Sequence, residues 1–253
     1  MQIIAALIVA AGRGSRFGGE GPKQYAQLAG KPLLRHAIEG FLAAPGLGLV
    51  RCAIHADDRA IYDAAVAGIS DARLLAPVIG GATRQASVRA GLEELAASEL
   101  PPDCVLIHAA ARPLVDIEVV AHVLAALDEN PGAIPALPVA DTLKRTDDDN
   151  SIVETVSRAG LWRAQTPQGF RFADILSAHK NALHEDFTDD ADLLQAAGKQ
   201  VMLVPGAESL LKVTIMADLQ TLEAHLAAQM ETRTGFGYDV HAFATGDHLT
   251  LGG

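Results

Sequence analysis

A run of glycines and basic residues follows the first apolar stretch of the chain. The apolar stretch covers residues 3–9, and the next segment contains Gly12, Gly14, Gly18 and Gly19 together with Arg13, Arg16 and Lys23. Glycine lets a backbone turn tightly and bring its N–H groups close to phosphate oxygens, while the basic side chains add positive charge. This combination predicts a cradle for a triphosphate, and the alternative is a flexible exposed turn.

The spacing of this segment does not fit the two best-known phosphate loops. No Gly-Lys-Ser/Thr follows, which excludes the P-loop pattern. Phe17 stands where the dinucleotide-binding fingerprint has its third glycine.

The elements that would position this loop follow from hydrophobic periodicity. Strand-like apolar runs occur at residues 3–9, 50–56, 105–108, 133–137 and 201–204, and amphipathic helical stretches lie between them, for example at 32–43, 87–97 and 117–127. This order predicts an α/β fold with a doubly wound, mostly parallel sheet and helices on both faces. The glycine-rich loop would then lie at the carboxyl edge of the sheet, where such folds bind ligands.

Composition narrows the class of protein. The formal charge of −11 would repel a polyanion, so we expect no nucleic-acid partner. The apolar N-terminus has no basic residue before it and runs into a glycine-rich loop, which predicts neither a signal peptide nor a membrane span. Cys52 and Cys104 lie in apolar runs and are expected to be buried free thiols. These features predict a cytoplasmic protein with no membrane partner.

Several spaced motifs resemble one enzyme family. They are AAGRGSRFG with PKQY, GGATRQASVRAGL, HAAARPL, ADTLKR, VSRAGLWRAQTPQ, FTDDADLL and LLKVT. In this order they resemble the cytidylyltransferases that make 4-diphosphocytidyl-2-C-methylerythritol in the non-mevalonate isoprenoid pathway, from Ile3 to about Met230. The resemblance implies a nucleotidyltransferase of Rossmann-like type that uses CTP and 2-C-methylerythritol 4-phosphate, releases pyrophosphate, requires Mg²⁺ and forms a homodimer through this domain.

The resemblance also implies roles for individual residues. Arg16 and Lys23 would stabilise the pentacoordinate phosphorus and the departing pyrophosphate. The triphosphate would lie on the backbone of Ala10, Ala11, Gly12 and Gly14. Cytosine and ribose would lie on the segment from Gly80 to Ser87, with Gly81 and Ser87 as site residues. The acceptor would be held by Thr142, Arg158 and Lys212, and Arg112, which also matches the family pattern, would bind substrate with them. Read without the resemblance, residues 80–87 are an ordinary loop and helix start with Ser87 as a cap.

Two positions depart from the family pattern. Ala109 stands where relatives carry an acidic residue that helps to hold the divalent metal, and Ala82 stands where an acidic residue is common. Loss of a carboxylate removes a hard oxygen ligand from a Mg²⁺ site that has few protein ligands. We therefore expect activity to be reduced, and neither acidic role is transferred to these alanines.

The C-terminal segment RTGFGYDVHAF resembles the start of 2-C-methylerythritol 2,4-cyclodiphosphate synthases. This predicts a cytidylyltransferase domain at 1–230 and, at 231–253, a linker and the first strands of an incomplete second domain. Asp239 and His241 would lie on one face of a strand and could bind Zn²⁺ or another divalent metal, but a third ligand is missing before Gly253. The second activity, a lyase, is expected only in a full-length bifunctional chain.

Two alternative functions stay open at this point. The same first loop would serve a nucleotidyltransferase for another alditol or sugar phosphate, such as ribitol 5-phosphate. A different class is a CTP-binding module whose catalysis is impaired by Ala109.

Overall fold

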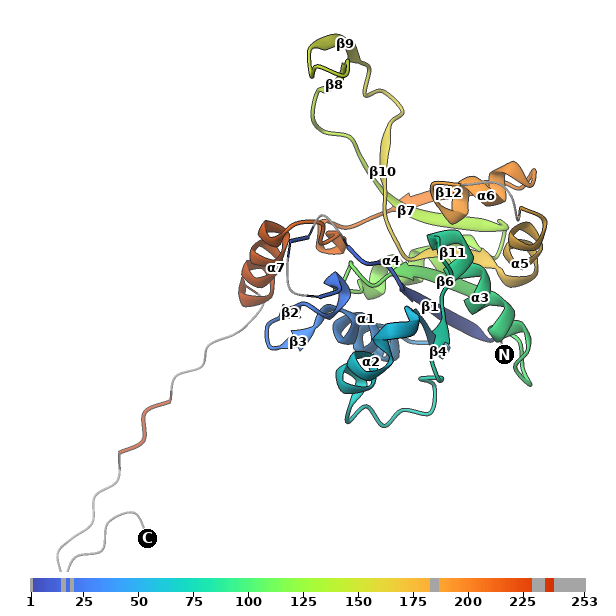
Figure 1. Ribbon diagram of the computed structural model, residues 1–253, viewed down its shortest axis with the longest axis vertical. Helices are drawn as coiled ribbons and strands as arrows, with labels where there is room; N and C mark the ends of the chain where they lie inside the picture. Colours follow the sequence, from blue (N-terminus) through green and yellow to red (C-terminus); the bar gives the residue numbers. More distant parts are fainter. Residues whose placement is uncertain (1, 15–16, 19–20, 183–186, 229–234, 239–253) are drawn as a thin grey trace, which may run out of the picture.

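The fold is built on one eight-stranded, mostly parallel sheet (Figure 1). The computed structural model describes residues 2–14, 17–18, 21–182, 187–228 and 235–238. The strands of the sheet are β1 (Ile4–Ala10), β4 (Leu47–Ile54), β5 (Val78–Ile79), β6 (Cys104–Ala109), β7 (Gly132–Pro138), β10 (Trp162–Ala164), β11 (Gln168–Arg171) and β12 (Val201–Pro205). Their order is β10-β7-β11-β6-β1-β4-β5, with β12 paired in parallel to β7.

Helices cover both faces of this sheet. One apolar cluster packs α1 (Leu33–Ala43), α2 (Arg59–Val66) and α4 (Ile117–Ala126) against Ala6 and Ile8 of β1. The opposite cluster packs α3 (Arg84–Ala96), α5 (Phe172–Asn181) and α6 (Asp190–Ala196) against Ala5 and Leu7. Successive side chains of a strand point to opposite faces, so β1 must be apolar throughout. The predicted fold class, a doubly wound α/β sheet, is confirmed.

The apolar runs of the sequence mark the central strands correctly. Each of the five runs coincides with a strand, namely β1, β4, β6, β7 and β12. The helix expected at 87–97 begins earlier, at Arg84, because the Thr83 hydroxyl caps it by accepting from the Ala86 N–H at 3.1 Å. Ser87 therefore lies inside the helix and is not its cap. Cys52 and Cys104 are buried free thiols, as expected.

A third, smaller apolar cluster closes one end of the molecule. The C-terminal helix α7 (Met216–Ala228) contributes Leu219 and Leu222, which pack with Phe17 and with Leu28 of the short hairpin β2 (Gln27–Leu28) and β3 (Lys31–Pro32). Phe17 thus fastens the glycine-rich loop to the body. The described residues also include three short 3₁₀ helices, η1 (Lys23–Tyr25), η2 (Ala56–Asp58) and η3 (Glu208–Leu210).

A two-stranded arm projects from the body between β7 and β10 (Figure 1). It consists of β8 (Leu143–Thr146) and β9 (Ile152–Val156), paired antiparallel. Asp147 holds the turn, because its Oδ1 accepts from the N–H groups of Asp149 and Ser151. The acidic run at the tip, Asp147 to Asp149, is therefore an exposed turn. Ile152 and Val153 on the arm are 65% and 57% exposed.

The C-terminal predictions are only partly covered by the structure. The proposed boundary near residue 231 and the expected ligands Asp239 and His241 lie outside the described residues, so the division at residue 230 stays a prediction. Among the helices that are described, none combines the length and hydrophobicity needed to cross a membrane.

Candidate active site

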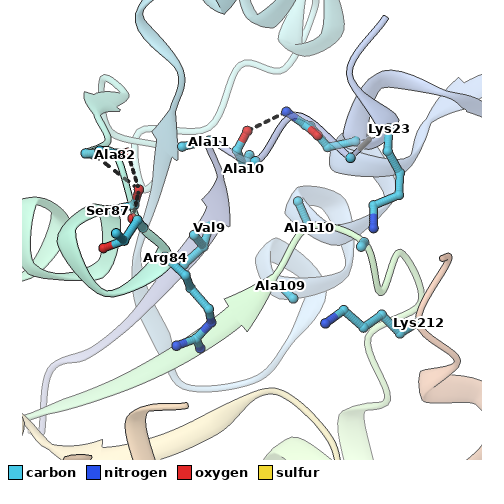
Figure 2. A pocket seen from close by; sticks show the side chains of 16 residues that line it. Val9, Ala10, Ala11, Lys23, Ala82, Arg84, Ser87, Ala109, Ala110 and Lys212 are labelled. Atoms are coloured by element: carbon cyan, nitrogen blue, oxygen red, sulfur yellow. Dashed lines mark hydrogen bonds between the residues drawn. The ribbon is translucent and has the colours of Figure 1, made fainter. Parts of the chain in front are cut away.

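A cavity of about 250 Å³ opens at the carboxyl ends of β1 and β6, where Val9 and Ala109 are register partners (Figure 2). The residues that line it are Val9, Ala10, Ala11, Gly12, Gly14, Lys23, Gln24, Gly81, Ala82, Thr83, Arg84, Ser87, Ala109, Ala110, Ala111 and Lys212. Eight predicted site residues are in this set: Ala10, Ala11, Gly12, Gly14, Lys23, Gly81, Ser87 and Lys212. Five different segments of the chain converge here, as expected at the ligand-binding edge of an α/β sheet.

Gly14 is required by the shape of the glycine-rich loop. Its φ is +64°, in the left-handed region, and a Cβ built on it would lie 2.9 Å from Cβ of Lys23. A larger residue would therefore strain the backbone and push Lys23 away. The loop turns back here through the hydrogen bond from Phe17 N–H to the Gly14 carbonyl at 2.9 Å. Gly14 thus permits the close approach that brings Lys23 to the cavity.

Gln24 anchors the same loop to the sheet. Its side chain is 4% exposed, and its Nε2 donates to the carbonyl of Ala10 at 2.6 Å. This bond joins η1 to the last residue of β1. The sequence did not single out Gln24, because only the fold brings it opposite Ala10.

Arg13 does not line the cavity, although the sequence suggested that it would add charge to a phosphate site. Its guanidinium donates to Asp57 at 2.8 Å and to Asp58 at 3.0 Å, and it contacts Nδ1 of His55 at 2.5 Å. The two carboxylates of η2 pair with this cation, whereas the described lining of the cavity offers it no carboxylate. Arg13 therefore ties the glycine-rich loop to η2.

The segment that precedes α3 forms the opposite wall. The Ser87 hydroxyl accepts from the Gly81 N–H at 3.1 Å and donates to the Thr83 carbonyl at 2.8 Å. A Cβ on Gly81 would lie 2.5 Å from Cβ of Ala86, so the loop can pack this closely on the helix only with glycine. Ser87 thus shapes the wall from within α3.

The cavity is electropositive. Lys23, Arg84 and Lys212 are its charged residues, and none of its described lining residues carries a carboxylate. Figure 2 shows Lys23 near Ala110, Lys212 directed towards Ala109, and Arg84 reaching from the opposite wall. Arg84 lies in the segment expected to contact cytosine and ribose, but the sequence did not single it out as a cation of the site. Such a cavity favours a polyanion.

The described lining residues do not fit a Mg²⁺ ion ligated by the protein. Mg²⁺ prefers oxygen ligands and is often held by substrate phosphates with one or two carboxylates. Ala109 has no side-chain oxygen, and none of the other described lining residues is a carboxylate. In the described part of the chain, no group of three or more His, Cys, Asp or Glu residues could hold a metal ion. Without a carboxylate in the described lining, a Mg²⁺ ion here would depend mainly on phosphate oxygens and water.

A buried hydrogen-bond chain fixes the backbone at Ala109. The Thr166 hydroxyl accepts from the Ala109 N–H at 3.2 Å and lies 3.0 Å from Nδ1 of His108. Nε2 of His108 lies 2.8 Å from the carbonyl of Arg112, which can only accept, so Nε2 is the protonated nitrogen and Nδ1 accepts from Thr166. Burial lowers the pKa of His108 to about 4, so this ring is neutral at neutral pH.

The family of the chain is decided by comparison with known proteins. The family model of 2-C-methyl-D-erythritol 4-phosphate cytidylyltransferase (IspD) matches residues 4–228. The chain belongs to this cytidylyltransferase family. The match spans every element described above, from β1 to α7.

Relatives of known sequence and structure agree with this assignment. The bifunctional enzyme IspD/IspF of Rhodospirillum rubrum is 54% identical over 253 residues, which are 100% of this chain and 65% of that protein. The cytidylyltransferase structure from Thermus thermophilus has a TM-score of 0.71 at 34% identity, and the aligned part covers 87% of this chain and 98% of the Thermus chain. The bifunctional IspDF of Campylobacter jejuni has a TM-score of 0.73 at 26% identity, over 88% of this chain and 55% of its own. The chain spans roughly three fifths of the length of its first curated relatives.

Three residues expected to bind the acceptor in this cytidylyltransferase fold do not line the cavity. Arg112 donates instead to the carbonyls of Leu210 and Ala164, and burial lowers its pKa to about 10. It therefore supports the segment that carries Lys212. Thr142 and Arg158 lie at the base of the arm, where Arg158 donates to the carbonyl of Ala140. Arg16, the remaining predicted catalytic residue, lies outside the described residues.

Proposed function

We propose that this chain transfers CMP from CTP to 2-C-methyl-D-erythritol 4-phosphate in the non-mevalonate isoprenoid pathway. A phosphate oxygen of the acceptor attacks the α-phosphorus of CTP, the bond to the β-phosphate oxygen breaks, and pyrophosphate leaves. The observation that carries the proposal is the cavity at the ends of β1 and β6, which gathers Lys23, Arg84 and Lys212 and has no carboxylate among its described lining residues.

The arrangement suits this reaction because the nucleophile is already an anion. No strong general base is needed. The demand is to align two polyanions that repel each other and to stabilise the charge of the transition state, which fixed cations and backbone N–H groups can do. Lys23 would act on the triphosphate from the glycine-rich loop, and Lys212 would act on the acceptor phosphate from the opposite side, with Arg16 as a further predicted cation.

In this proposal the metal ion would bind together with the nucleotide. A Mg²⁺ ion would be held by phosphate oxygens of CTP and water, where it would neutralise phosphate charge. The Zn²⁺ or other divalent ion predicted for Asp239 and His241 belongs to the second domain of a full-length chain and stays a prediction. The cytoplasmic location also stays a prediction.

A homodimer is part of the proposal. Thr142 and Arg158 lie at the arm and not at the cavity of their own chain, and the arm exposes Ile152 and Val153. Two adjacent apolar side chains that are exposed in this way are expected to be covered by a partner surface. In a homodimer the arm of one chain would bring Thr142 and Arg158 to the acceptor side of the partner's cavity, where the family pattern expects them.

Pyrophosphate release from CTP tests the proposal. We expect release with methylerythritol phosphate and much less with ribitol 5-phosphate at equal concentrations. Lys23→Ala should lower kcat/KM by about 100-fold or more, as the loss of a transition-state cation does. Lys31→Ala is the matched control, since Lys31 pairs with Glu39 at 2.7 Å and does not line the cavity.

The alternatives give different results. Equal rates with the two acceptors would contradict the substrate and favour a broader alditol phosphate transferase. Tight binding of CTP in a calorimeter without any pyrophosphate release would contradict the enzyme and favour a CTP-binding module.

A further inference from the structure

We infer that Arg84 is a phosphate-binding residue of this cavity and that Asp190, supported by His179, is its positioning residue. The inference rests on the proposed function for its ligand, which is a phosphate oxygen of CTP or of the acceptor.

Arg84 stands at the boundary between the cavity and the protein interior. It is the first residue of α3, it lines the cavity, and its Nη2 donates to Oδ2 of Asp190 at 2.5 Å. Its side chain is 37% exposed, whereas that of Asp190 is fully buried. A guanidinium carries five N–H donors in a planar fork, so one edge can bond Asp190 while another binds a phosphate.

The direction of Arg84 matches this role. In Figure 2 its guanidinium reaches from the wall formed by Ala82 and Ser87 into the region below Ala109, to which Lys212 also points. Lys23 lies above Lys212 in the same view, next to Ala110. All three cations line the one cavity, where the nucleotide and the acceptor would meet.

Asp190 is built to remain ionised and to hold Arg84 still. Burial alone would raise its pKa, but the charge of Arg84 and the hydrogen bond from His179 outweigh that effect and hold the pKa below its ordinary value. Oδ1 of Asp190 lies 3.1 Å from Nε2 of His179, which is itself fully buried. Both carboxylate oxygens are thus engaged from fixed directions, by α3 and by α5.

This fixation has a consequence for ligand binding. A free arginine side chain loses rotamer freedom when it binds a phosphate, and that loss weakens binding. Arg84 is already ordered by Asp190 before a ligand arrives. Asp190 and His179 therefore hold the Arg84 guanidinium in place before a phosphate binds.

A purely structural ion pair is the competing explanation. The helices concerned are already joined by buried apolar residues, among them Val88 of α3, Ile175 of α5 and Leu193 of α6. A buried ion pair contributes little net stability compared with such packing. A structural pair also gives no reason for the cation to lie on the cavity wall.

Calorimetric titration of the whole chain tests Arg84, with CTP in one arm and methylerythritol phosphate in the other. Arg84→Gln should weaken binding of one of these ligands by about 10- to 100-fold, the range expected for charge-assisted hydrogen bonds. Arg84→Lys should recover part of the loss, because it restores the charge but not the fork. Arg73→Gln is the matched control, since Arg73 is also 37% exposed, bonds Asp71 at 2.7 Å and does not line the cavity. Wild-type affinity of Arg84→Gln in both arms would overturn the inference.

A double-mutant cycle tests the positioning role of Asp190. Asp190→Asn keeps the size of the side chain. It should weaken binding of the ligand that depends on Arg84 several-fold when Arg84 is present, and it should have no further effect in the Arg84→Gln background. Additive losses would mean that Asp190 acts independently of Arg84 and would overturn its positioning role. If Asp190→Asn does not fold, His179→Asn takes its place in the cycle, and the Arg84 variants still decide the binding role.

The two proposals can fail separately. Arg84-dependent binding of CTP without pyrophosphate release would support the role of Arg84 and contradict the proposed function. Pyrophosphate release that is unaffected by Arg84→Gln, with unchanged affinities, would do the reverse.

Discussion

Ala109 ends β6 and lines the cavity together with three cations, and none of the described lining residues carries a carboxylate. Ala109→Asp would add a hard oxygen ligand beside the phosphates. We predict that it lowers the Mg²⁺ concentration for half-maximal pyrophosphate release several-fold, because a carboxylate shares the coordination of the ion. Ala109→Asn is the control of equal size without the charge. An unchanged Mg²⁺ requirement in Ala109→Asp would contradict the prediction.

His108 leads to a prediction for the pH dependence of stability. Its pKa is lowered to about 4 by burial, so the folded state stays unprotonated while the unfolded chain binds a proton near pH 6.5. The free energy of unfolding should therefore be highest above pH 6.5 and fall as the pH drops towards 4, by roughly 3 kcal/mol from this group. Urea unfolding of wild type and His108→Gln at several pH values measures the difference. Parallel pH curves for the two proteins would contradict it.

Residue types alone could not predict the whole site. Gly14 and Lys23 lie in one segment, and their types and spacing indicated a phosphate loop. Arg84 lies in the segment 80–87 that the resemblance assigns to cytosine and ribose, but its ion pair was not predicted because Asp190 lies 106 positions away. Arg13 was misjudged for the same reason, since the fold and not the spacing brings Asp58 to it.

At the scale of elements, the glycine-rich loop and η1 work as one unit. Gly14 and Gly18 both have positive φ, at +64° and +74°, but only a Cβ on Gly14 would meet Lys23. We predict that Gly14→Ala and Gly18→Ala each cost about 1 kcal/mol of stability from backbone strain. Only Gly14→Ala should also raise KM for CTP, because it displaces Lys23. Thermal unfolding and steady-state kinetics separate the effects, and equal KM values in the two variants would exclude the displacement.

Element prediction succeeded for strands that carry continuous apolar runs. The strands β1, β4, β6 and β7 are largely buried in the covered sheet, and their runs follow from that position. β12 was also found from its apolar run, although Met202 and Leu203 are exposed. The arm escaped prediction because β8 and β9 are largely exposed and carry Lys144, Arg145 and Glu154, which give no apolar alternation. Its two strands are held by pairing with each other, and no local sequence pattern indicates that pairing.

At the scale of the whole molecule, the position of the arm decides how the acceptor site is completed. The proposed homodimer predicts that each cavity takes Lys212 from one chain and Arg158 from the other. Arg158→Ala and Lys212→Ala should each be nearly inactive alone. In a mixed dimer, however, one of the two cavities would contain both intact residues.

Unfolding and refolding the two variants together tests this arrangement. Random pairing makes about half of the dimers mixed, and one active cavity in each should restore about a quarter of the wild-type rate if Kd lies well below the protein concentration. Lys23→Ala mixed with Lys212→Ala is the control, because both residues line the same cavity and no mixed dimer would contain an intact site. Sedimentation equilibrium should give twice the chain mass. Recovery in the control as well as in the test, or in neither, would contradict the shared site.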